Sequence, residues 1–172
     1  MLKFAGACLI LASAAGIGRS FGMDLKKRLQ ELRALKQLVC MLRGEIRYTK
    51  SPLPEAFFHI AGRLPAPFAG FLFAVAKELG KADGRSLGRI WEERIEKDLS
   101  ASHLSRADKG QLETLGELLG YLDLEMQLSA IDLYLEQLEL SIQEAGGSVG
   151  QKQRLYQSLG VAGGVFLVIL LI

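Results

Sequence analysis

Residues 24–49, DLKKRLQELRALKQLVCMLRGEIRYT, decide the expected fold because their apolar side chains recur at steps of three and four. That spacing is typical of one face of an α-helix. The apolar face consists of Leu25, Leu29, Leu32, Leu35, Leu38, Leu42 and Ile46. The other face carries Lys26, Lys27, Arg28, Arg33, Lys36, Arg43, Arg47 and Lys50. We expect the helix to begin at Asp24, a good N-cap, and to end near Thr49, before the prolines of residues 51–54.

The chain beyond this helix alternates between apolar helical patterns and turn residues. A short helix is expected from Pro54, since proline suits the first helical turn. A turn over residues 62–67 leads to a third helix, residues 68–79. A turn over residues 81–84 then precedes a fourth amphipathic helix that extends to residue 99.

Two further helices complete the expected domain. Ser105 is a suitable N-cap for a fifth helix, and Asp123 for a sixth after a break at residues 120–122. The apolar face of the sixth is expected to include Met126, Ile131, Leu135, Leu138 and Ile142. Gly146-Gly147 is interpreted as a loose joint. No alternating run of β-branched and aromatic residues predicts a strand, so the sequence indicates an all-α bundle of about six helices.

Both ends of the chain are apolar. Residues 4–18 and residues 159–172 carry no charged side chain. A membrane-spanning helix needs ~20 apolar residues, with a lower limit of about 17, and both runs approach that length with their flanks. The sequence therefore predicts three parts: an N-terminal transmembrane anchor over residues 1–22, a helical domain over 23–150 and a C-terminal transmembrane segment over 151–172.

The charges beside the two apolar runs predict the orientation. Arg19 and residues 26–28 follow the first run, and Lys152 and Arg154 precede the second. Positive charge remains on the cytoplasmic side, so the domain is expected in the cytoplasm. An alternative stays open, because residues 12–14 (Ala-Ser-Ala) resemble a signal-peptide cleavage site. Cleavage would make the chain a secreted helical envelope protein with a C-terminal membrane anchor.

The overall composition excludes some functions and permits others. The net charge of +2 gives no case for a nucleic-acid binder. A chain that is 49% hydrophobic and 23% charged fits a soluble helical domain that carries membrane segments. Cys8 and Cys40 are interpreted as packing residues, because free cysteine behaves as a small hydrophobe.

Charge is distributed unevenly along the chain. No lysine or arginine occurs between Lys109 and Lys152. This acidic arm carries Glu113, Glu117, Asp123, Glu125, Asp132, Glu136, Glu139 and Glu144. The arm either lies beside the basic first helix or forms a docking surface for another protein. For the second case, the residues expected to bind a partner are Asp132, Glu136 and Glu139.

The patterns that could indicate an enzyme are weak. Residues 146–150 match G-x-S-x-G, but a helix precedes them, and His59 and His103 both come too early for the hydrolase order. No G-x-x-x-x-G-K-[ST] loop is present. The two histidines have no second ligand at metal-binding spacing, and Asp83 and Asp123 are expected in a turn and a cap. We expect no enzyme, no cofactor, no metal and no small-molecule substrate.

Three segments carry a family resemblance: residues 41–56 (MLRGEIRYTKSPLPEA), residues 115–123 (LGELLGYLD) with Gln127, and residues 156–160 (YQSLG). Together they resemble the stage III sporulation protein AB family. The resemblance covers essentially the whole chain. Gly146-Gly147 departs from the expected continuous helix into the terminal segment.

That resemblance implies a function. The family's domain is similar to the cytoplasmic helical domain of type II secretion system F proteins. Membership implies a platform or adaptor of the mother cell–forespore channel, in the mother-cell membrane facing the forespore. The implied partners are the stage III sporulation protein AA ATPase and other membrane proteins of the same operon.

Overall fold

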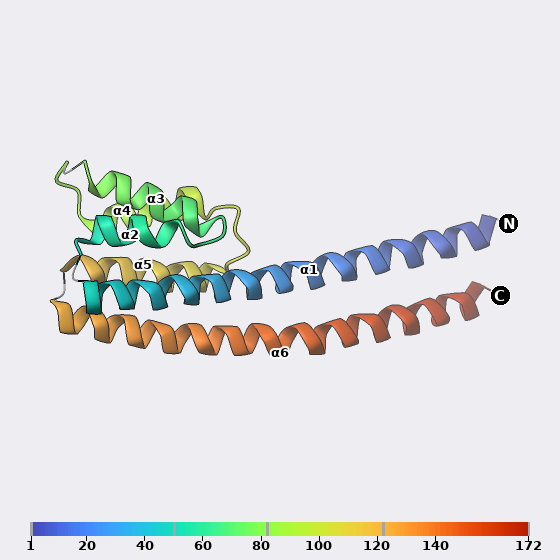
Figure 1. Cartoon of the computed structure of the whole chain (residues 1–172). Helices are drawn as coiled ribbons and strands as arrows, with labels where there is room; N and C mark the ends of the chain where they lie inside the picture. Colours follow the sequence, from blue (N-terminus) through green and yellow to red (C-terminus); the bar gives the residue numbers. More distant parts are fainter. Residues whose placement is uncertain (1, 50, 82, 122, 172) are drawn as a thin grey trace. The chain divides into compact units, whose positions relative to one another are not determined.

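The computed structural model describes the backbone of residues 2–49, 51–81, 83–121 and 123–171, and the side chains of residues 23–49, 51–81, 83–121 and 123–147. Within these backbone ranges every regular element is helical (Figure 1). The elements are α1 (Leu2–Gly44), the π-helical turn η1 (Glu45–Thr49), α2 (Leu53–Ala61), α3 (Phe68–Leu79), α4 (Leu87–Asp98), α5 (Arg106–Tyr121) and α6 (Leu124–Leu171). The predicted all-α fold with about six helices is confirmed.

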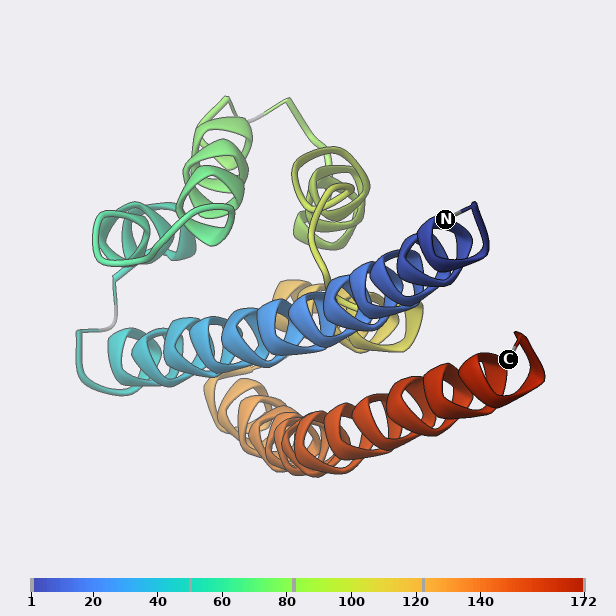
Figure 2. The same ribbon diagram turned by 90° about the vertical axis from the view of Figure 1, so that its right-hand side faces the viewer.

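The chain divides into two compact units. One is Gln30–Ile142, and the other combines Met1–Leu29 with Gln143–Ile172. In the second unit the beginning of α1 and the end of α6 run in opposite directions, and both views place the two termini at the same end (Figures 1 and 2).

The predicted boundaries of the middle helices agree with the structure. Pro54 is the second residue of α2, α3 covers residues 68–79, and α4 ends one residue before the expected position. The Ala66–Pro67 peptide bond in the turn before α3 is cis. Ser86 also caps α4, because its hydroxyl accepts a hydrogen bond from the Arg89 amide at 3.4 Å.

The two N-caps expected in the second half of the domain are confirmed. The Ser105 hydroxyl accepts a hydrogen bond from the Asp108 amide at 3.1 Å, while the Ser105 amide donates to Asp108 Oδ2 at 2.8 Å. This reciprocal pair satisfies two amides at the start of α5. Asp123 Oδ1 accepts from the Met126 amide at 3.0 Å and begins α6.

Two local predictions are wrong. Asp24 is not an N-cap, since α1 passes through it from Leu2, and an N-cap needs a preceding residue outside the helix. Gly146-Gly147 is not a joint, since α6 continues through both glycines to Leu171. Each glycine costs about 0.5–1 kcal/mol relative to alanine, which the 48-residue helix tolerates. The two terminal segments are therefore extensions of α1 and α6, not separate helices.

The membrane anchors predicted over residues 1–22 and 151–172 lie outside the residues whose side chains are described. Over the described part of the chain, no helix combines the length and the apolar character that a membrane crossing needs.

The core of the Gln30–Ile142 unit centres on Trp91, which is completely buried on α4. Its ring lies 5.4 Å from Phe57 of α2 and 4.9 Å from Phe71 of α3, measured between centroids. The Phe71 contact is edge-on, an arrangement that aromatic pairs favour. Trp91 Nε1 donates to the Leu112 carbonyl of α5 at 2.9 Å, so the buried polar atom is satisfied.

Glycines allow α4 and α5 to approach closely. A Cβ atom on Gly116 would lie 2.2 Å from Cδ1 of Trp91, nearer than any real contact. A Cβ on Gly88 would lie 3.2 Å from Cα of Glu117, and one on Gly120 would lie 3.3 Å from Cβ of Leu87. We call this contact the α4–α5 crossing, and its three glycines set the separation of the two helices.

Candidate interaction surfaces

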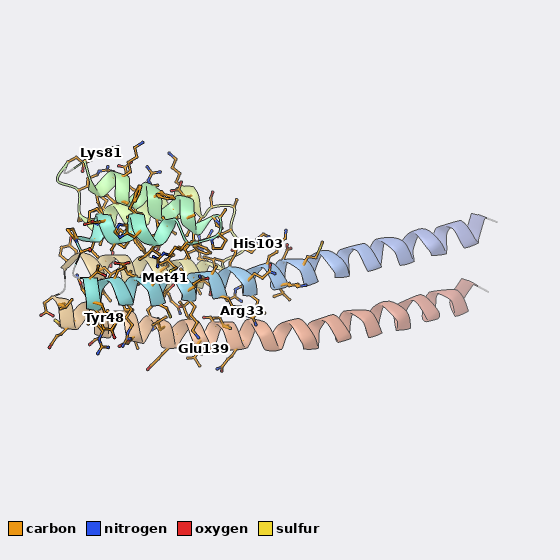
Figure 3. All side chains as sticks on the ribbon, in the orientation of Figure 1. Arg33, Met41, Tyr48, Lys81, His103 and Glu139 are labelled. Carbon is orange, nitrogen blue, oxygen red and sulfur yellow. The ribbon has the colours of Figure 1, made fainter. Side chains whose placement is uncertain are left out.

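The basic face of α1 meets the acidic face of α6. Arg43 binds Asp132 through two hydrogen bonds, Nε to Oδ1 at 2.5 Å and Nη2 to Oδ2 at 3.0 Å. Two turns away, the Lys36 ammonium pairs with Glu139, which Figure 3 labels on α6. These contacts raise the pKa of Arg43 and of Lys36. The structure therefore supports the first of the two interpretations, in which basic helix and acidic arm lie side by side.

These ion pairs hold two of the three residues that the sequence predicted for partner binding. All four side chains are between 36% and 47% exposed, so solvent screens both pairs and each contributes little to stability. Glu136 is different, because it is exposed and no ion pair to it occurs among the described residues. Whether any of the three contacts a partner stays a prediction.

The outer face of α6 exposes large apolar side chains. Met126 is 55% exposed, Leu133 is 57% exposed and Leu140 is 66% exposed. On the opposite side of the same helix, Ile131 and Leu138 are buried. Within residues 124–142, α6 therefore has two apolar faces, whereas a surface helix of a single domain normally has one. Met126, expected on the same apolar face as Ile131 and Leu138, lies on the exposed face instead.

A groove between α4 and α5 forms a second acidic surface. It is lined by Ser86, Gly88, Arg89, Glu92, Glu93, Glu96, Glu117, Leu118 and Tyr121. Burial raises the pKa of the neighbouring Glu113, and repulsion from Glu92, Glu96 and Glu117 raises it further. No pattern in the sequence predicts this surface, because Glu92 and Glu96 alternate with basic residues along the chain and only the fold brings them beside α5.

A third charged cluster ties α3 to α4. Glu78 on α3 pairs with Arg85 and, at 2.6 Å, with Arg94. These two guanidinium groups lower the pKa of Glu78 to about 2. The carboxylate of Glu78 is thus balanced by two arginines of this chain, and the cluster connects α3 to α4.

Few groups among the described residues could support catalysis or bind a metal. Those residues contain no group of three potential ligands, and His59 is exposed. His103 donates its amide to Glu31 Oε2 at 2.7 Å and places Nδ1 3.1 Å from Oε1. Residues 146–150 lie inside α6, which lacks the strand-to-helix turn of a hydrolase.

The cysteine prediction is wrong in one of its two parts. Cys40 is exposed on α1, while its neighbours Leu38 and Val39 occupy the buried positions. Cys8 lies outside the residues whose side chains are described.

These features define a class of protein: an all-α protein whose first and last helices are much longer than the helices between them. Comparison with known proteins gives the family. The family model described as Stage III sporulation protein AB (spore_III_AB) matches residues 3–172, and the chain belongs to this family. Family membership supports a role in sporulation.

Individual relatives agree with this assignment. Stage III sporulation protein AB of Bacillus subtilis (strain 168) is 29% identical over 171 residues, which are 99% of each chain. A solved structure of stage III sporulation protein AB is similar with a TM-score of 0.67 and 29% identity, over 72% of this chain and 97% of that chain.

The structure also explains one of the segments that carried the resemblance. Within residues 115–123, Gly116 accommodates Trp91 and Asp123 caps α6. Gln127 Nε2 donates to the Leu119 carbonyl at 2.8 Å and closes the corner between α5 and α6. This segment therefore builds the α4–α5 crossing and the start of α6.

Proposed function

We propose that this chain is a non-enzymatic membrane platform of the mother cell–forespore channel required for endospore formation. In this proposal the terminal segments anchor it in the mother-cell membrane, and residues 23–150 face the cytoplasm. There the domain docks the stage III sporulation protein AA ATPase, while other membrane proteins of the operon join it in the membrane. Family membership over residues 3–172 supports the sporulation role.

The antiparallel arrangement of the two terminal segments supports the proposed membrane anchoring. Met1–Leu29 and Gln143–Ile172 belong to one compact unit and run in opposite directions, with both termini at one end. A chain that enters and leaves a bilayer in this way has its middle part on one side. The positive residues that flank both apolar runs assign that side to the cytoplasm.

A thiol-labelling experiment tests the orientation. Cys40 is an exposed native thiol, and Ser102→Cys in a Cys40→Ser background supplies an independent position. A membrane-impermeant maleimide should leave both unlabelled in intact cells and label both after permeabilisation. The Cys40→Ser variant without Ser102→Cys measures the background from Cys8. Labelling in intact cells would contradict the proposed topology and favour the secreted alternative.

Charge reversal tests ATPase docking. Asp132→Lys or Glu139→Lys would set like charges against Arg43 or Lys36 and disturb the fold, whereas Glu136 has no such partner among the described residues. Glu136→Lys should weaken co-purification of the ATPase with the full-length chain, and added salt should weaken it in the wild type. Glu55→Lys, at an exposed position on α2, is the matched control. Unchanged association at all salt concentrations would exclude electrostatic docking through Glu136.

A further inference from the structure

We propose that the outer face of α6 binds one helix of a partner protein, a helix with apolar residues every seven positions and lysine or arginine beside them. The binding face consists of Met126, Leu133 and Leu140, with Glu125 and Glu136 at its edge. This inference rests on the proposed docking role and adds the chemistry of the element that docks.

The spacing of the three apolar residues indicates a helical occupant. They are seven residues apart, so each lies only ~20° around an ideal helix from the previous one. Apolar residues repeated in this way form the seam between two packed helices. From Met126 to Leu140 the face is roughly 21 Å long at 1.5 Å per residue, which a partner helix of four turns would cover.

Other exposed apolar residues do not form such a row. Tyr48 lies on η1 and Tyr121 at the end of α5, while Phe58 of α2 packs edge-on against Phe73 of α3 with ring centroids 5.1 Å apart. Single exposed apolar residues on separate elements are normal in soluble domains, whereas an aligned group indicates contact with another molecule. The alignment on α6 is what distinguishes this face.

The negative charge beside the apolar row favours a positively charged binding partner. Glu125 and Glu136 are exposed beside the apolar row, and neither forms an ion pair among the described residues. Residues 110–151 contain no lysine or arginine, so the same face of a second copy would bring carboxylates against carboxylates. An anionic bilayer surface would repel the carboxylates in the same way. A protein helix with basic residues beside its apolar row is attracted by both features.

Two synthetic helical peptides provide the test. Both carry leucine at heptad a and d positions, but one has lysine and the other glutamate at the flanking positions. Binding to the full-length chain in neutral-lipid nanodiscs is followed by fluorescence anisotropy. We expect the lysine peptide to bind, its affinity to fall as salt rises, and the glutamate peptide not to bind.

Substitutions on α6 then locate the binding. Leu133→Ser combined with Leu140→Ser should raise the Kd of the lysine peptide at least about tenfold, because two apolar anchors are lost. Both residues are more than half exposed, so the helical signal and the thermal midpoint should be unchanged. Tyr48→Ser, at a residue that is 79% exposed on η1, is the control and should bind like the wild type.

Several outcomes would overturn the inference. Equal binding of the two peptides would do so, as would an unchanged Kd in the Leu133→Ser, Leu140→Ser variant. Self-association of the wild type that this variant abolishes would identify a second copy as the occupant. Slower labelling of Leu133→Cys, in a Cys40→Ser background, in anionic than in neutral nanodiscs would identify the membrane surface.

The experiment also separates this inference from the proposed function. If the ATPase does not co-purify with the wild-type chain but selective peptide binding through α6 persists, the helix-binding face stands and the ATPase assignment fails. If the ATPase co-purifies equally with the wild type and the double variant, and peptide binding is unchanged, the platform role stands and the helix-binding face fails.

Discussion

The α4–α5 crossing and the outer face of α6 are both rich in apolar residues, but these residues are buried at the crossing and exposed on α6. At the crossing, Trp91, Leu112 and Leu115 are buried, and glycines bring the backbones together. On the outer face of α6, Leu133 and Leu140 are more than half exposed. Both regions show helical spacing of apolar residues. Helical spacing therefore indicates that a helix has an apolar side, but it does not indicate whether this chain itself covers that side.

The largest expected effect separates the two faces of α6. Leu138→Ala should lower the free energy of unfolding by about 2–5 kcal/mol, because Leu138 is 1% exposed and its removal leaves a cavity. Leu140→Ala, two residues along the same helix, should change it by less than about 0.5 kcal/mol. Thermal unfolding of the full-length chain in detergent, followed by circular dichroism, measures both. Equal losses would show that the outer face is packed within this chain.

A smaller loss is expected at the α4–α5 crossing. Gly116→Ala should cost about 1–3 kcal/mol, since the new methyl group would overlap the Trp91 ring. Gly110→Ala on the same helix is the control, because no atom lies within 4 Å of its Cβ position. Alanine there should stabilise by up to about 1 kcal/mol, through its better helix propensity. The same unfolding assay applies, and tolerance of Gly116→Ala would contradict the close crossing.

The beginning of α6 should show an intermediate effect. Asp123→Ala should cost about 1 kcal/mol, because the Met126 amide loses its acceptor. Glu125→Ala, an exposed change in the first turn, should stay within about 0.5 kcal/mol. Hydrogen exchange at the start of α6 reports the change locally. Unchanged protection in Asp123→Ala would mean that the cap does not stabilise this boundary.

The smallest effect concerns the groove beside the α4–α5 crossing. The pKa of Glu113 in the fold lies above its ordinary value of 4.5, so folding favours the protonated form. This contribution is fully present below pH 4.5 and is lost as pH rises through the raised pKa. Glu113→Gln should therefore raise the thermal midpoint at pH 7 and have little effect near pH 4, whereas exposed Glu55→Gln should change neither. A lower midpoint at pH 7 would contradict the repulsion among Glu92, Glu96 and Glu117.

Local chemistry made most helix boundaries predictable. Ser105 and Asp123 each cap their own next turn, so their roles depend on residues three positions away. The same reasoning failed at Asp24 and at Gly146-Gly147, where the continuous helical backbone on both sides overrides a local cap or breaker. Cap residues and glycines therefore mark possible helix boundaries, and the long helices α1 and α6 continue through some of them.

The interaction surfaces were less predictable than the helices. The acidic arm is visible in the sequence as a run without lysine or arginine. Its pairing is not, because Arg43 and Asp132 are 89 positions apart and Lys36 and Glu139 are 103 positions apart. The cluster of Glu92, Glu96, Glu113 and Glu117 has no signature along the chain. No local pattern reports which side chains a crossing of two helices brings together.

The sequence by itself determined the all-helical class, most helix ends, the two apolar ends and the family resemblance, since all of these depend on composition and on neighbours within a few residues. Only the tertiary structure decided which carboxylates are paired, which apolar face of α6 is buried and why Gly116 must be a glycine. These depend on distances between helices, and helical periodicity is the same whether the partner helix belongs to this chain or to another protein.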